Sequence, residues 1–116
     1  MEILNSQEIP EWLKYPSEYR LLIVENIVNF SPWYLLDAKL ARLRYEGLRQ
    51  RYPSRHFFAF AARLDNDEIA CWEIDKPGRI LILEDFMPEE FAALKEFSTF
   101  WDWFRAAIED MIEGCE

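Results

Sequence analysis

Short apolar runs alternate with polar breaks between residues 56 and 86. Three runs rich in aromatic or β-branched residues are separated by Leu-Asp-Asn-Asp at 64–67 and by Asp-Lys-Pro-Gly at 75–78. Such runs are typical of β-strands, and Asn, Asp, Pro and Gly are the residues that tight turns need. The pattern therefore predicts a meander of three antiparallel strands, with the rest of the chain packed against it.

Helical patterns precede this meander. Apolar residues recur at helical spacing from Ser17 to about Val28. Asp37 is suited to cap a second helix that runs to about Arg51 and carries Leu40, Leu43 and Leu48 on one side. We expect that side to face the core.

The end of the chain has the clearest helical pattern. Its apolar residues form a stripe along one side of the expected helix. Trp103 lies about 100° or more from the centre of this stripe, so its side chain either covers a neighbouring loop or is exposed. The stripe follows the i, i+3, i+4, i+7 spacing of an amphipathic helix. Its members are Phe97, Phe100, Trp101, Phe104, Ala107, Ile108, Met111 and Ile112.

Together these elements predict that residues 1–116 form a single α+β domain. Its antiparallel sheet has three strands, or four to five if Trp33–Leu36 and other segments add strands at the edges. N-terminal and C-terminal helices pack on this sheet. The longest apolar run has four residues, far short of the ~20 that cross a bilayer, so we expect no membrane partner. The first residues lack the features of a secretion signal, and two cysteines without framework spacing fit a reducing compartment; both predict a cytoplasmic protein.

Charge is distributed unevenly along the chain, whose net charge is -9. Residues 1–58 carry 8 Lys and Arg against 7 Asp and Glu, whereas residues 59–116 carry 5 against 15. An acidic surface repels nucleic acid and attracts a basic protein, although it also simply keeps a protein soluble. The basic side of the 37–51 helix is the one feature that favours nucleic-acid binding. The favoured interpretation of this side is a solvated face that pairs with acids elsewhere in the fold.

Acidic residues lie at the first turn of the meander and at the end of its third strand. If the second and third strands pair through the 75–78 turn, five carboxylates share one end of the sheet: Asp65, Asp67, Glu68, Glu84 and Asp85. Solvated turn residues are the simplest interpretation, followed by a protein-binding patch and then by a metal site, for which the turn lacks the ligand spacing of a calcium loop. No catalytic or cofactor motif is present, so we expect no enzyme, no cofactor and no bound metal; a metal-assisted hydrolase remains as a distant alternative.

Five segments, taken in order, show a resemblance to a known family: Pro-Ser-Glu-Tyr-Arg-Leu-Leu (16–22), Phe-Ala-Phe-Ala (58–61), Asp-Asn-Asp-Glu (65–68), Ile-Ala-Cys-Trp (69–72) and Phe-Ser-Thr-Phe-Trp-Asp-Trp-Phe (97–104). They resemble the SUKH superfamily, small bacterial domains similar to the yeast cell-wall-assembly regulator. The resemblance implies an α+β domain that often acts as an immunity protein, binding and blocking a toxin, frequently a nuclease. Our leading hypothesis is thus a protein-binding domain that neutralises a basic toxin through the five acids, with Trp103 as an aromatic anchor; the alternative is a scaffold or regulatory domain without a toxin partner. The sequence sets no oligomeric state.

Overall fold

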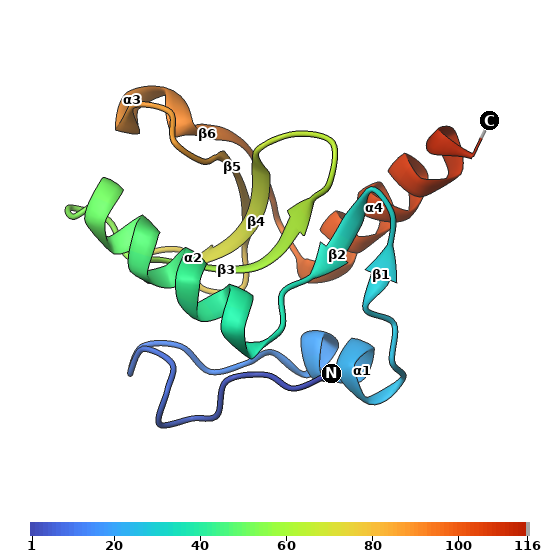
Figure 1. The fold of residues 1–116 in the computed structure, drawn as a ribbon, viewed down its shortest axis with the longest axis horizontal. Coiled ribbons are helices and arrows are strands. Elements are labelled where there is room, and N and C mark those ends of the chain that lie inside the picture. Colours follow the sequence, from blue (N-terminus) through green and yellow to red (C-terminus); the bar gives the residue numbers. More distant parts are fainter. Residues whose placement is uncertain (116) are drawn as a thin grey trace.

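The computed structural model describes residues 1–115 and has an α+β fold with a six-stranded antiparallel sheet and four helices (Figure 1). This confirms the expected class and adds a strand to the expected maximum of five. In chain order the elements are α1 (Ser17–Val24), β1 (Asn29–Phe30), β2 (Trp33–Leu35), α2 (Ala38–Arg51), β3 (Phe57–Arg63), β4 (Glu68–Glu73), β5 (Ile80–Glu84), α3 (Glu89–Ala92), β6 (Ala93–Phe97) and α4 (Phe100–Gly114).

The strands follow one another in the sheet in the order in which they occur in the chain, and every neighbouring pair is antiparallel. The predicted meander is present as β3, β4 and β5. Trp33 and Leu35 do lie in a strand, but β2 is not an edge, because β1 pairs with its outer side. The sequence also missed β6, which pairs with β5 through Ile80 and Phe97. No helix among the described residues is long and apolar enough to cross a membrane.

Helix α2 begins where the sequence predicted, because the Asp37 carboxylate accepts a hydrogen bond from the Leu40 N–H at 2.9 Å. Its predicted apolar side is wrong. Leu48 is buried, but Leu40 and Leu43 are exposed, Leu43 by 57%. The helix instead turns Ala41, Leu48 and the half-buried Tyr45 inward, residues that follow one another at helical spacing.

Trp103 of α4 is 1% exposed, so of the two positions that the helical pattern left open the structure has the covering one, and the side chain is not available as a surface anchor. Its ring centroid lies 5.0 Å from that of Phe60 and 5.6 Å from that of Trp33. The β1–β2 hairpin, which carries Phe30 and Trp33, lies along α4 (Figure 1) and covers the flank of the helix where Trp103 projects. The buried side of α4 therefore includes Trp103, and Met111, which the sequence placed in the apolar stripe, is exposed.

Tyr15 makes the stability of the fold sensitive to high pH. Its hydroxyl donates a hydrogen bond to the buried carbonyl of Leu4 at 2.9 Å. Burial raises the pKa of Tyr15 to about 12, with a further contribution from the nearby Glu8 carboxylate and a small opposing one from Arg20. Burial also raises the pKa of Tyr19, whose ring centroid is 5.1 Å from that of Tyr15.

We therefore expect the contribution of Tyr15 to the free energy of unfolding to be constant up to about pH 10, where an unfolded tyrosine ionises, and to be lost as the pH rises towards 12. The raised pKa of Tyr15 alone corresponds to a loss of roughly 2–3 kcal/mol across this window. Urea unfolding at a series of alkaline pH values measures the decline. Tyr15→Phe should make the decline shallower by this amount, while the raised pKa of Tyr19 still contributes to it. An equally steep decline in that variant would contradict the assignment.

Candidate protein-binding site at one end of the sheet

The pairing of β4 with β5 brings the predicted acids to one end of the sheet. Glu68 lies opposite Glu84 in the register, and the Asp85 N–H donates a hydrogen bond to the Asp67 carbonyl at 3.0 Å. The backbones of the 65–68 turn and of the 84–85 strand end are therefore side by side, as the sequence predicted. The side chains of the five acids, however, do not share one surface.

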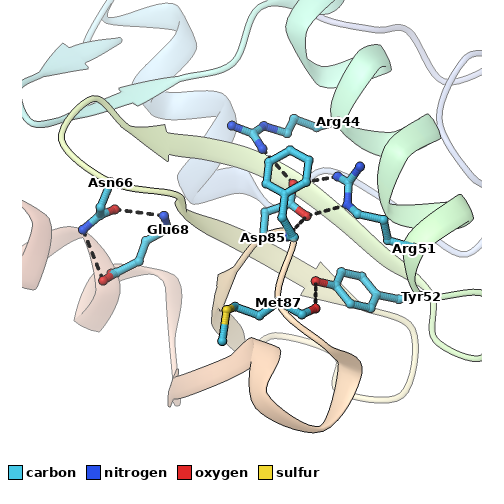
Figure 2. Close-up of polar contacts among 8 residues, drawn as sticks. Arg44, Arg51, Tyr52, Asn66, Glu68, Asp85 and Met87 are labelled. Atoms are coloured by element: carbon cyan, nitrogen blue, oxygen red, sulfur yellow. Dashed lines mark hydrogen bonds and ion pairs between the residues drawn. The ribbon is translucent and has the colours of Figure 1, made fainter.

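Asp85 is buried, 1% exposed, and its proposed contact with a partner is wrong. Its carboxylate lies between two guanidinium groups of α2 (Figure 2): Arg44 donates at 2.7 Å, and Arg51 donates twice, at 2.8 and 2.7 Å. Successive side chains in a strand point to opposite faces, so Asp85 points towards α2 whereas Glu84 shares the other face with Glu68.

The other four acids keep access to solvent, and we call Asp65, Asp67, Glu68 and Glu84 the acidic rim. Within the described residues, no lysine or arginine forms an ion pair with Asp67, Glu68 or Glu84. Glu68 is positioned by Asn66, whose side-chain oxygen accepts from the Glu68 N–H at 2.8 Å and whose amide donates to its carboxylate at 3.3 Å (Figure 2). These three carboxylates are the uncompensated part of the rim.

Asp65 differs from them because Arg63 binds it. The guanidinium donates two hydrogen bonds to the Asp65 carboxylate, at 2.8 and 2.9 Å, which lowers the pKa of Asp65 below its ordinary value. Arg63 also donates to Asp110 of α4 at 3.0 Å and lies over the ring of Trp33. Asp65 thus keeps its negative charge to a lower pH than an isolated aspartate does, but Arg63 neutralises part of its field.

The basic side of α2 is engaged within the fold. Arg44 and Arg51 bind Asp85, Arg42 binds Glu8 at 2.6 Å, and Arg49 contacts His56 at 2.8 Å. Of the 13 Lys and Arg, eight form ion pairs with acids of the described chain. The arginines of α2 therefore do not form a free phosphate-binding surface, in keeping with the favoured interpretation of this helix.

Phe86 is a surface feature that sequence reasoning missed. It follows Asp85 directly, has a left-handed backbone with φ of 73° and is 62% exposed. Its ring centroid is 4.2 Å from Cζ of Arg51. A groove of about 300 Å³ lies beside it, which we call the α2 groove; its lining residues are Tyr34, Leu36, Leu40, Leu43, Arg44, Arg51 and Phe86. The signal for it in the sequence is the placement of Leu40 and Leu43 on the same helical side as Arg44 and Arg51, which separates them from Leu48.

The described residues offer little for covalent or metal chemistry. No group of three or more His, Cys, Asp or Glu side chains in 1–115 is arranged to hold a metal ion, so the hydrolase alternative gains no support from this part of the chain. Cys71 is fully buried, and burial, with a smaller effect of Asp85, raises the pKa of its thiol well above the ordinary value. A thiol in this state is a poor nucleophile.

Comparisons with known proteins leave the relationship to the SUKH superfamily a prediction from the segments quoted above. No protein-family model, no curated protein and no solved structure matches the chain.

Proposed function

We propose that this protein is a non-enzymatic binding domain that neutralises a basic bacterial toxin domain, such as a nuclease, through the acidic rim. The observation that supports this most is the unequal use of charge. Arg44 and Arg51 of α2 are paired with the buried Asp85. In contrast, Asp67, Glu68 and Glu84 are grouped at one end of the sheet and form no ion pair with a lysine or arginine among residues 1–115. The resemblance to SUKH immunity proteins points to the same role.

A nuclease must carry cationic groups to hold phosphate, and a cluster of carboxylates can occupy the same groups. The net charge of -9 accelerates the encounter with such a partner over distances of about one Debye length, roughly 10 Å at 0.1 M salt. Association should therefore slow as salt is added. The partner would be the toxin domain encoded by the gene directly upstream, where an immunity gene is expected to have its toxin.

A variant in which the acidic rim is neutralised tests this function. Protection of a host that expresses the upstream toxin domain should be lost when the rim is replaced, because association slows and the partner's cations lose their counter-charges. The four changes leave every ion pair of α2 in place. They are Asp65→Asn, Asp67→Asn, Glu68→Gln and Glu84→Gln.

The matched control removes the same number of charges elsewhere and should retain protection, since its exposed acids lie outside the rim. Its changes are Glu11→Gln, Glu25→Gln, Asp75→Asn and Glu109→Gln. Thermal melting of both variants verifies that they fold. Full protection by the rim variant would remove the rim from consideration, and the lack of any toxin gene upstream would favour the scaffold alternative.

A further inference from the structure

We propose that the α2 groove binds the carboxyl terminus of another polypeptide, whose apolar last residue lies beside Phe86 and whose carboxylate binds Arg44 and Arg51. This site is separate from the acidic rim. None of the rim acids lines the groove, and Glu68 and Glu84 lie on the face of the sheet that points away from α2. The inference therefore goes beyond the proposed function and does not depend on it.

The lining of the groove carries one positive charge in excess, in a chain whose net charge is -9. Arg44 and Arg51 both line the groove, and both bind the carboxylate of the buried Asp85. No other acid among residues 1–115 forms an ion pair with either arginine. One further carboxylate from a ligand would neutralise this excess, whereas a ligand with a row of phosphates is repelled by the rest of the chain.

The two guanidinium groups also keep hydrogen-bond donors for such a ligand. Each has five N–H groups, of which Arg44 uses one for Asp85, on Nη1, and Arg51 uses two, on Nε and Nη2. Their side chains are 25% and 29% exposed, so the remaining donors are accessible but partly shielded from water. Hydrogen bonds from arginine to a carboxylate are among the strong ones in proteins. One arginine can therefore hold the terminal carboxylate and the other the carbonyl of the preceding peptide group.

The walls of the groove select an apolar last residue. Leu43 and Phe86 are exposed, and Leu40 lies one helical turn before Leu43 on the same side of α2. Tyr34 and Leu36 also line the groove. Its volume of about 300 Å³ is at the lower end for ligand sites, which suits a single leucine or phenylalanine. Because Leu43 and Phe86 are open to solvent, the rest of the bound chain can leave along the surface.

Gly47 leaves the space that the Arg51 guanidinium occupies. It lies inside α2, one turn before Arg51, at a place where glycine weakens a helix relative to alanine. A Cβ atom at this position would lie 2.7 Å from both Nη atoms of Arg51, which is too close for the two groups to coexist. An alanine at position 47 must therefore displace the guanidinium from its place at the groove.

Phe86 is held in place as the opposite wall. Its left-handed backbone is unfavourable for a bulky side chain and persists where neighbouring groups fix it. The Phe86 N–H donates to the Asp85 carboxylate at 2.9 Å, and the Tyr52 hydroxyl donates to the Met87 carbonyl at 2.7 Å (Figure 2). Its ring lies over the Arg51 guanidinium. A wall that is already ordered loses less entropy when a ligand binds.

Three synthetic peptides test this on the full-length protein. The first is acetyl-Gly-Gly-Leu with a free carboxylate, the second is its carboxyl-terminal amide, and the third has Ser in place of Leu and a free carboxylate. We expect the first to bind about tenfold more tightly than either of the others, because the amide lacks the charge and Ser lacks the apolar side chain. In ¹⁵N-labelled protein it should shift the amide resonances of Leu40, Leu43 and Phe86 and leave those of Asp65 and Glu68 unchanged.

Variants show which groups are responsible. Arg44→Gln should bring the affinity of the first peptide down to that of its amide, and Gly47→Ala should do the same in part by displacing the Arg51 guanidinium. Leu43→Gln changes an exposed position and should remove the difference between Leu and Ser without lowering the melting temperature. Arg42→Gln is the matched control, because Arg42 lies on the same helix but forms an exposed pair with Glu8, and it should preserve both differences.

Each comparison can overturn a part of the proposal. Equal affinities for the acid and the amide would contradict the role of the arginines, and equal affinities for Leu and Ser would contradict the apolar site. Hexanoate has a carboxylate and an apolar chain but no peptide group, so it should bind more weakly than the first peptide; equal or tighter binding would overturn a chain terminus as the occupant. Shifts outside the groove alone would overturn the whole assignment. The acidic rim is tested separately, by protection against the toxin.

Discussion

Replacement of Asp85 by Asn should destabilise the protein by about 3 kcal/mol, the lower part of the range for breaking a buried ion pair. Arg44 and Arg51 would keep their positive charges against a carboxamide that offers a single acceptor oxygen in place of two. Their partial exposure to water moderates the cost. The Phe86 N–H would also lose its charged acceptor, so the β5–α3 connection should loosen.

Urea unfolding of the wild type and of Asp85→Asn measures this difference. Glu8→Gln is the control, because the pair of Glu8 with Arg42 is exposed on both sides and such pairs contribute less than about 1 kcal/mol. Equal losses in the two variants would show that the cluster around Asp85 has no special role in stability.

Truncation of Trp103 to Ala should cost about 3–5 kcal/mol, as expected for a large aromatic side chain in a packed core. Trp103 is enclosed by Phe60, Trp33 and Phe30, whose ring centroids lie at 5.0, 5.6 and 6.0 Å from its own. Removal of the ring leaves a cavity between α4 and the β1–β2 hairpin that neither element can close by itself. The melting temperature and the urea midpoint should both fall.

Trp101→Ala serves as the comparison, since Trp101 is half-buried on the same helix and contacts Phe100 and Phe104. We expect about half the loss or less for this variant. If Trp101→Ala lowered the free energy of unfolding more than Trp103→Ala did, the core would be centred on the apolar stripe that the sequence predicted. That result would contradict the packing described above.

The meander could be predicted because its signals are local. The turns at 64–67 and 75–78 contain the residues that turn conformations need, and the runs between them are dense in strand formers. Strand β6 carries no such signal: residues 93–96 are exposed, so no alternation of buried and polar positions marks them, and their strand conformation depends on pairing with β5. The conformation of such residues cannot be predicted from the local sequence, because it depends on pairing with another strand.

The same limit explains the split of the acidic cluster. Glu84 and Asp85 are neighbours of nearly the same chemistry, and β5 is buried on both faces from Ile80 to Leu83, so the apolar pattern does not say which acid points inward. The answer lies in Arg44 and Arg51, more than 30 residues earlier in the chain. Because Arg44 and Arg51 bind this carboxylate from one side of α2, Leu40 and Leu43 on the same side remain at the surface.

The order of the sheet has a consequence for how quickly the chain can fold. Each strand pairs with its predecessor in the chain, so the sheet can grow one hairpin at a time without threading a segment between strands already paired. The longest excursion separates β2 from β3, and α2 shortens it because a helix forms from local contacts. We expect rapid folding for a sheet of this size, limited by the step that docks α2 and closes this single long loop.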